Sequence, residues 1–341
     1  MTKGKKAVAI VAAVVVVICC ALGGWYLHYR KSPAYSLTMA AEAVEKHDWD
    51  TFQKYVDTAS VLDHFYYDAI KETLRESDFS PAMQGVALQM ADSLKPRIID
   101  SLNYLVRTYV EQGSVNEAVV PKQEGSLVNP IPYRMLGGLA HLTGKLETKE
   151  DADGATVTTS IHDDRVGADF PIVIRMKKND DGFWKAVSWE NAGDFMRQWH
   201  EAEQTALASL NAPIEDQLSQ LVKIDSLNGR VEPADALGIT QQLRFAISGT
   251  VKSDKPVVEI DGYVKASTPE GVSVAASFEQ HMEGLTNGTV KWDMARELSP
   301  FVQSDLTVMQ AKNLTWEGKI TKVVFSDGSK IETYKELPEK K

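Results

Sequence analysis

The feature that most constrains this chain is an apolar run near its N-terminus. No charged residue occurs from Ala7 to Leu27, a stretch of 21 positions. At about 1.5 Å of rise per residue, a helix of this length spans roughly 30 Å, the thickness of the hydrocarbon core of a bilayer. We therefore expect a transmembrane helix over 7–29, preceded by a short segment over 1–6.

Charged residues flank the run unequally. Lys3, Lys5 and Lys6 precede it together with the amino terminus, whereas Arg30 and Lys31 follow it. The positive-inside rule places the more basic side in the cytoplasm. The sequence therefore predicts a single-pass protein of the cell membrane, with residues 1–6 cytoplasmic and the bulk of the chain extracytoplasmic.

A cleaved signal peptide and a lipoprotein leader are the alternatives to an uncleaved anchor. A signal peptide has a shorter apolar core that ends at a small-x-small cleavage site, but here the apolar run continues through the candidate site. A lipoprotein leader has a small residue before the modified cysteine, but Ile18 precedes Cys19, and Cys19 precedes Cys20. The uncleaved anchor fits these residues better than either alternative.

Composition limits the chemistry of the exported part. Both cysteines lie inside the predicted span, so the 310 residues after Lys31 can form neither a disulfide nor a thiolate metal site. Those residues carry 32 basic and 47 acidic side chains, a formal charge of −15. This balance argues against a nucleic-acid partner and against a protein that lies flat on anionic lipid.

The first exported segment combines helical and strand patterns. Helical spacing dominates from about 36 to 112, with a break near Lys46, an N-cap at Asp48 and a kink or break expected at Pro96. Strand patterns follow over 144–161, 168–178 and 182–189, and a further helix leads past Trp199. The turn expected at "DDG" makes the last two strands a hairpin. We predict an α+β domain over 32–210.

The second exported segment has a mainly β pattern. A boundary is expected near Asn211-Ala212-Pro213, followed by a linker over 211–240 that contains a short helix. Short apolar runs at regular spacing then predict a small β-sandwich over 241–336. A terminal hairpin is expected at "SDG" (326–328), and residues 337–341 are expected to form a tail.

The stretch "SPAYSLTMAAEAVEKHDWDTFQKYVDTASVLDHFYYDAI" resembles a bacterial family of membrane-anchored proteins of unknown function. The family has a Ser-Pro-x-Tyr start after its transmembrane helix and then an Asp-x-x-x-Phe-x-x-Tyr-Val-Asp motif. The matching residues here are Ser32, Pro33, Tyr35, Asp48, Phe52, Tyr55, Val56 and Asp57. The resemblance implies an anchored protein and supplies no catalytic residue.

Two further resemblances concern the fold. The order of helices and strands up to Trp199, with the late strand "DGFWKAVSW", is similar to the cone-shaped α+β fold of nuclear-transport-factor-2-like domains. "LRFAISGTVKS" resembles the first strand of immunoglobulin-like modules of bacterial surface proteins. The first resemblance implies a cavity between the concave sheet and the helices.

Candidate sites are few. None of the seven histidines makes an H-x-x-x-H or H-E-x-x-H pair, and no G-x-S-x-G elbow or phosphate-binding loop occurs. We therefore predict no catalytic residue, no metal and no cofactor. The candidates for ligand binding are three tryptophans that could line the cavity: Trp184, Trp189 and Trp199. Trp184 and Trp189 have opposite strand parity, so both can face it only across a bulge, and core packing is the competing interpretation.

These patterns together favour a non-catalytic binding or scaffolding role in the cell envelope. The partner would be an envelope protein, peptidoglycan or a small ligand, and the membrane would be engaged through helix 7–29. The rival hypothesis is a small-molecule sensor or enzyme that uses the cavity of the α+β domain. A third is a subunit held in a membrane complex through the helix itself.

Overall fold

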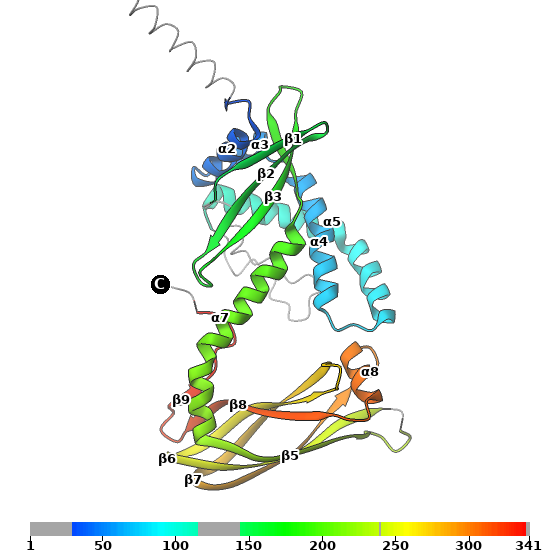
Figure 1. Cartoon of the computed structure of the whole chain (residues 1–341), viewed down its shortest axis with the longest axis vertical. Helices are drawn as coiled ribbons and strands as arrows, with labels where there is room; N and C mark the ends of the chain where they lie inside the picture. Colours follow the sequence, from blue (N-terminus) through cyan, green and yellow to red (C-terminus); the bar gives the residue numbers. More distant parts are fainter. Residues whose placement is uncertain (1–28, 115–143, 239, 339–341) are drawn as a thin grey trace, which may run out of the picture. The chain divides into compact units, whose positions relative to one another are not determined.

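The computed structural model describes residues 29–114, 144–238 and 240–338 (Figure 1). The described residues form α+β structure with antiparallel sheets, as predicted, and contain six helices and two sheets. None of their helices is both long enough and apolar enough to cross a membrane. Apart from Tyr29, the predicted span over 7–29 and the segment 1–6 lie outside the described residues, as does the end of the predicted tail.

The chain divides into two compact units. The first unit comprises Met1–Thr73 and Ala91–Trp199, and the second comprises Leu74–Met90 and His200–Lys341. The predicted boundary near residue 211 is wrong, because helix α7 (Ala192–Leu221) continues through Pro213. A proline in a helix interior costs about 3 kcal/mol. Burial of Leu218 in the core of the second unit helps to offset this cost.

Two short helices open the first unit, α2 (Pro33–Glu45) and α3 (Trp49–Tyr55). Ser32 and Asp48 cap them by accepting a backbone hydrogen bond from the residue three positions on, at 3.1 and 2.9 Å. Between the helices, His47 adopts a left-handed conformation with φ of 57°. The helix break and the Asp48 cap that the sequence predicts are therefore confirmed.

Two longer helices follow, α4 (Thr58–Glu76) and α5 (Pro81–Gln112). Of the kink or break expected at Pro96, the structure contradicts the break, because α5 runs through the proline without interruption. Buried side chains on both sides of the proline, including Ala91 and Leu102, hold the two halves of the helix in place. Tertiary packing therefore outweighs the local cost of the proline.

The sheet of the first unit is a four-stranded antiparallel meander in chain order. Its strands are β1 (Glu147–Asp151), β2 (Gly154–Asp163), β3 (Ala168–Lys178) and β4 (Trp184–Trp189). The single strand expected over 144–161 is in fact β1, a turn and β2. The predicted hairpin between β3 and β4 is confirmed, with Gly182 at a φ of +77° in its turn. Helices α2 and α3 pack against this sheet (Figure 1).

The second unit contains a five-stranded antiparallel sheet and helix α8 (Gln303–Gln310). Its strands are β5 (Val222–Pro233), β6 (Gln241–Ser267), β7 (Ser273–Leu298), β8 (Thr315–Phe325) and β9 (Lys330–Glu332). The linker predicted over 211–240 is therefore largely the end of α7 and strand β5. The terminal hairpin is confirmed as β8 and β9, joined by a turn with Gly328 at a φ of +81°.

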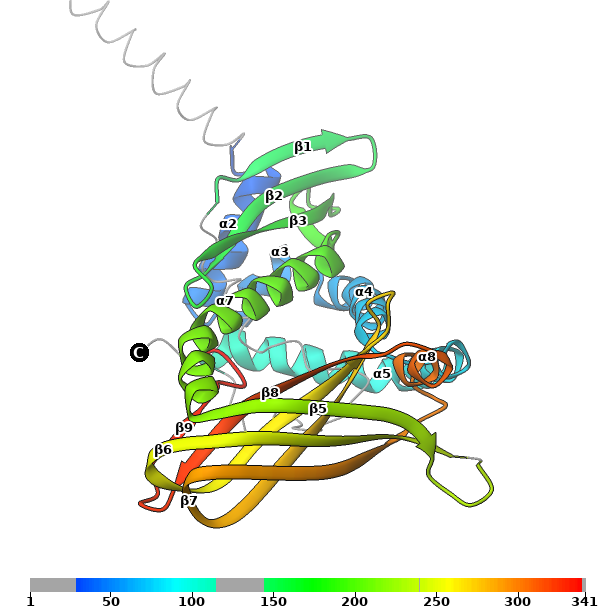
Figure 2. The same cartoon turned by 60° about the horizontal axis from the view of Figure 1, so that its bottom comes forward.

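The sheet of the second unit bends in the middle of β6 and β7 (Figure 2). The register of β6 shifts between Lys252 and Glu259. Before this stretch β6 pairs with β5, and from Val257 onward it pairs with β8. Phe278 and Trp292, on the two halves of β7, have ring centroids only 5.3 Å apart. Both halves of the sheet therefore contribute to one core.

This bend corrects the prediction of a β-sandwich over 241–336. The described strands of the second unit form one continuous sheet, and two strands of 27 and 26 residues replace several short ones. The polar stretch "KSDKP" reads in the sequence as a break between strands, but in the structure it lies inside β6 at the bend. The apolar runs on either side of it do face one core, as in a sandwich.

The connection between α4 and α5 belongs to the second unit. We call residues 77–80 the hairpin tip. Asp78 caps the N-terminus of α8: its carboxylate accepts a hydrogen bond from the Ser304 backbone at 2.9 Å, and its carbonyl accepts one from Gln303 at 2.7 Å. The Ser80 backbone also donates to the Phe301 carbonyl at 2.9 Å. Helix α8, which has no side-chain cap at its own Val302, is capped from a distant part of the chain.

Candidate functional site

A cavity of about 110 Å³ lies in the first unit, between its helices and one face of its sheet. Its wall is made of apolar and aromatic side chains. The lining residues are Leu37, Ala40, Ala41, Val44, Phe52, Val56, Val61, Val106, Tyr109, Val110, Ile172, Ile174, Ala186 and Trp189. They come from α2, α3, α4, α5, β3 and β4 and from the residue that follows α3.

The spacing of the lining residues follows from the elements that carry them. On α2 the cavity is lined at positions 37, 40, 41 and 44, which is the spacing of one helix face. On β3 it is lined by Ile172 and Ile174, which share one face of a strand. A short parallel bridge joins Val56 to Ala186, and the Asp57 backbone donates to the Ala186 carbonyl at 2.8 Å. These bonds fix the turn after α3 against β4.

A bulge in β4 decides which tryptophan faces the cavity. Arg175 of β3 pairs with Ser188, and the next residue of β3 pairs with Ala186, so that one residue of β4 has no partner. The extra residue reverses the parity of the strand. Ala186 and Trp189, which would otherwise lie on opposite faces, therefore both line the cavity. The structure thus contains a bulge of the kind that Trp184 and Trp189 would need in order to lie on one face of the strand.

Trp189 is the one predicted tryptophan among the described lining residues. Its ring packs against Phe195 with centroids 4.9 Å apart and against Phe65 with centroids 5.8 Å apart. Its Nε1 donates to Asn191 Oδ1 at 2.9 Å, and the same Oδ1 accepts the Val173 backbone N–H at 2.8 Å. The aromatic contacts and the indole hydrogen bond hold Trp189 in one orientation.

Trp184 is buried outside the cavity wall. Its Nε1 donates to the Lys31 carbonyl at 2.9 Å, which ties β4 to the residue that precedes the N-cap of α2. Lys178, directly opposite on β3, places its Nζ 4.8 Å from the centre of the indole. Trp184 therefore holds the start of the described chain against the sheet.

Trp199 lies at the turn between β2 and β3. Its Nε1 donates to Asp163 Oδ2 at 2.8 Å, and the Arg165 guanidinium lies 5.4 Å from its ring and 2.8 Å from the same carboxylate. Burial raises the pKa of Asp163, but the hydrogen bonds from Arg165 and Trp199 outweigh it and leave the pKa below its usual value. The three tryptophans therefore do not share a site.

The wall of the cavity offers little acid–base chemistry. Its described lining residues include no carboxylate, imidazole or ammonium group. Tyr109 is the ionisable residue among them, and burial raises the pKa of its hydroxyl, so that it is neutral near pH 7. An apolar cavity of about 150 Å³ in another protein stays dry and binds benzene. The wall is thus suited to hold a small apolar group.

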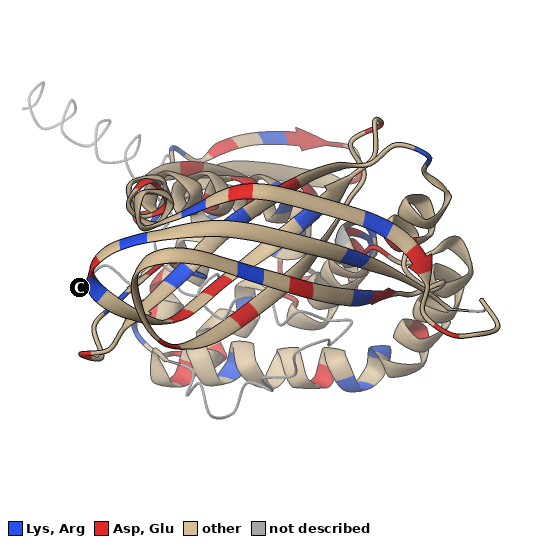
Figure 3. Ribbon diagram, turned by 90° about the horizontal axis from the view of Figure 1, so that it is seen from below, with Lys and Arg blue, Asp and Glu red and all other residues tan. Residues whose placement is uncertain are grey.

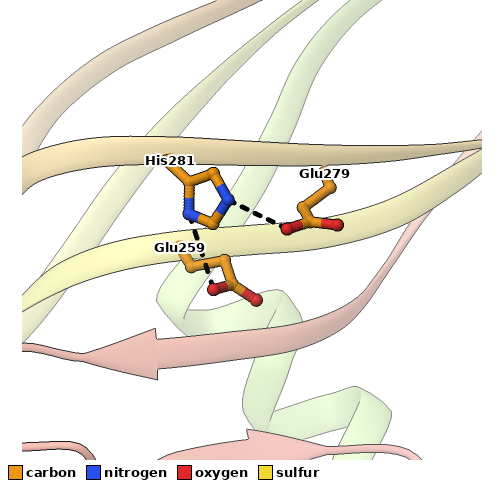
Figure 4. A group of neighbouring side chains, drawn as sticks. All are labelled: Glu259, Glu279 and His281. Atoms are coloured by element: carbon orange, nitrogen blue, oxygen red, sulfur yellow. Dashed lines mark ion pairs between the residues drawn. The ribbon is translucent and has the colours of Figure 1, made fainter.

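A second cluster has the residue types of a metal site but a different geometry. His281 lies between two carboxylates, with Nε2 2.9 Å from Glu279 and Nδ1 3.5 Å from Glu259 (Figure 4). Because opposite ring nitrogens face the two carboxylates, one ion cannot take both contacts. Lys322 already pairs with Glu259 and Asp261, and its hydrogen bond lowers the pKa of Glu259. We interpret the cluster as an ion-pair network on the outer face of the sheet.

This network is one part of a mixed surface. Basic and acidic residues are interspersed along the strands of the second unit's sheet (Figure 3). Arg244, for example, pairs with Asp293 at 3.0 Å across β6 and β7. Such exposed pairs contribute about 0 to 1 kcal/mol each and chiefly keep the surface soluble.

The sequence did not predict that the helical half of the cavity wall forms part of a site. Its signal was present in the helical spacing of Leu37, Ala41 and Val44, but spacing alone does not show that small side chains leave a space. No model of a protein family matches this chain, and no curated protein sequence matches it.

Proposed function

We propose that this protein is a non-catalytic binding protein of the cell envelope, and that the cavity of the first unit takes up a small apolar group. The observation that carries the proposal is the cavity itself, with a volume of about 110 Å³ and a wall of apolar and aromatic side chains. A reaction would need an acid, a base or a nucleophile at this wall. The ionisable group among its described lining residues is Tyr109, whose hydroxyl is neutral near pH 7 and whose pKa is raised further by burial.

The proposed place is the outer side of the cell membrane. It is supported by the uncharged run from Ala7 to Leu27 and by the three lysines that precede it. The Ser-Pro-x-Tyr and Asp-x-x-x-Phe-x-x-Tyr-Val-Asp motifs support membership of the membrane-anchored bacterial family. The order of elements from α2 to β4 supports the likeness to nuclear-transport-factor-2-like domains, in which such a cavity is expected.

A scaffolding role toward an envelope protein or peptidoglycan is the second candidate. It is supported by the two-unit organisation of the chain, because each unit has its own core and could contact a different partner. In a scaffold, the cavity would be a packing defect without a ligand. The two proposals therefore differ in what filling the cavity should do.

The test is the binding of benzene, a probe of suitable size, to the full chain held in lipid nanodiscs. Hydrogen–deuterium exchange of α2 and β4 is measured with and without a saturating concentration of benzene. A ligand that binds only the folded state slows exchange by a factor of about 1 + [L]/Kd. We expect slower exchange in peptides that contain Val44 and Ala186.

A filled variant and a matched control complete the experiment. Ala41→Leu adds three carbon atoms at the wall, whereas Ala275→Leu makes the same change at an exposed position of β7. Partition of benzene into the lipid is equal in all samples and therefore cancels. Ala275→Leu should retain the slowing and Ala41→Leu should lose it. Equal slowing in both variants, or none in the native chain, would contradict the cavity as the binding site and favour the scaffold.

A further inference from the structure

The residues that follow the proposed anchor are attached to the β3–β4 hairpin. The Lys31 carbonyl accepts a hydrogen bond from Trp184 Nε1 at 2.9 Å. Tyr29, at the end of the proposed span, is two residues earlier, and two residues reach at most about 7 Å. Given the proposed anchor, on which this inference rests, the indole of Trp184 lies within about 10 Å of the membrane boundary.

The segments brought together there carry an excess of basic residues. We call Tyr29–Lys31 and Lys177–Lys185 together the basic end of the first unit. The basic end contains five basic and two acidic side chains, although the exported part as a whole is acidic. Its four lysines form no ion pair with a carboxylate of the described residues: Lys31, Lys177, Lys178 and Lys185.

The pairing of the hairpin places like charges side by side. Lys177 of β3 is directly opposite Lys185 of β4, and their side chains lie on the same face of the sheet. Like charges directly opposite one another destabilise a strand pair. An anionic surface next to the hairpin would remove this repulsion.

Exposed aromatic side chains accompany these lysines. Tyr29 is 37% exposed and Phe183, in the turn of the hairpin, is 36% exposed. Aromatic rings next to basic groups are typical of the interface between a membrane and water. The basic end therefore has both kinds of residue that such an interface selects.

We propose that the basic end rests on the headgroups of anionic lipids and holds the first unit against the membrane from which its anchor emerges. Each lysine near an anionic membrane surface contributes about 1 kcal/mol, which corresponds to about a fivefold change in an equilibrium. The acidic remainder of the exported part is repelled by the same surface. Contact is therefore confined to this end, and the chain does not lie flat.

The test compares the full chain in nanodiscs of zwitterionic phosphatidylcholine with nanodiscs that also contain anionic phosphatidylglycerol. Hydrogen–deuterium exchange is followed in peptides that cover Lys177–Lys185. We expect exchange about fivefold slower in the anionic discs, the contribution of one basic side chain. Raising the salt from about 0.05 to 0.5 M should remove the difference, because the screening length falls well below 10 Å.

Two triple variants show whether these lysines are responsible. The variant K177E/K178E/K185E should lose the dependence on lipid charge, whereas the control K252E/K265E/K291E should retain it. Each variant changes two exposed lysines and one half-buried lysine, and those of the control lie in the second unit. Unchanged exchange in peptides of β2 in the same samples shows that the first unit remains folded.

The outcomes separate this inference from the proposed function. Equal exchange in the two kinds of disc would overturn the contact with lipid, as would a lipid dependence that survives in K177E/K178E/K185E. Both results leave the binding of benzene untouched. A chain that does not co-purify with discs of either kind would overturn the proposed anchor and this inference with it.

Discussion

The two units bury their apolar side chains in different ways. In the first unit, helices pack on one face of a four-stranded sheet, and a cavity of about 110 Å³ remains between them. In the second unit, the halves of one bent sheet share a core in which side chains as large as Phe245, Leu243 and Ile260 are almost wholly buried. The hollows described in that unit are lined partly by charged residues, such as Glu215 and Lys319.

The difference shows where the cavity comes from. Three alanines stand at the contact between helix and sheet in the first unit: Ala40, Ala41 and Ala186. Protein interiors are normally packed as closely as organic crystals. Side chains that line an unfilled space lose van der Waals contacts on that side. Small side chains at this contact, rather than a shortage of apolar surface, therefore produce the cavity.

The largest expected effect comes from removing a phenylalanine from each core. Phe245→Ala should destabilise the second unit by about 3 to 5 kcal/mol, because it opens a void in a filled core. Phe52→Ala should cost the first unit less, toward about 3 kcal/mol, because Phe52 already borders the cavity and is less completely buried. Exchange of slow amides, read unit by unit, measures both. The reverse order would show that the first unit is the more tightly packed.

Buried ion pairs provide a second comparison. Asp305 of α8 is 1% exposed and accepts hydrogen bonds from Arg296 at 2.9 Å and from the Ser299 backbone at 2.8 Å. Asp305→Asn should destabilise the second unit by about 3 kcal/mol, because it leaves Arg296 without its charge partner. In the exposed pair, Asp293→Asn should cost less than about 1 kcal/mol. Denaturant titration of both variants tests the contrast, and similar losses would contradict it.

Replacing a small side chain by a larger one should have opposite effects on the stability of the two units. Ala186→Val extends into the cavity and should stabilise the first unit by about 1 kcal/mol. Ala266→Val makes the same change on a buried position of β6 that lines none of the described hollows, and it should destabilise the second unit by about 1 to 3 kcal/mol. Thermal unfolding of the two variants is the measurement. A destabilising Ala186→Val would mean that the cavity cannot accept two more carbon atoms.

The smallest expected effect is a loss of stability of the first unit at acid pH. The pKa of Asp163 is lower in the folded chain than the value near 3.9 of an unfolded one. The Asp163 carboxyl therefore binds a proton more readily in the unfolded state. Its ionised form stabilises the fold above about pH 4, and this contribution is lost as the pH falls through the folded pKa. Exchange of β2 and β3 should speed up over this range. Asp163→Asn should be less stable at neutral pH and lack this part of the acid response, and an unchanged response would reject the assignment.

Local signals in the sequence predicted local structure well. Asp48 capped a helix because its carboxylate satisfies a free backbone amide, and "DDG" gave a hairpin because glycine tolerates the left-handed conformation. Helix α5 is not broken at Pro96, and helix α7 runs through the boundary expected near Pro213. In both helices, side chains on either side of the proline are buried, and this burial outweighs the local cost of the proline.

Features that depend on distant parts of the chain could not be predicted. The sequence indicated that a bulge would be needed for Trp184 and Trp189 to face one cavity, but not where it occurs. The bulge lies between Ala186 and Ser188, and it places Trp189 in the wall while Trp184 binds the Lys31 carbonyl. Likewise, the bend in β6 depends on how its two halves share a core.

The hairpin tip has a consequence for the order of events during synthesis. Asp78 caps α8 from 226 residues away, and α8 has only eight residues, too few to be a stable helix by itself. Chains grow at about 5 to 20 residues per second, so the tip is made about 10 to 45 s before its partner exists. All residues of the first unit precede His200. It can therefore be complete while the second unit, made of an early and a late segment, must close last.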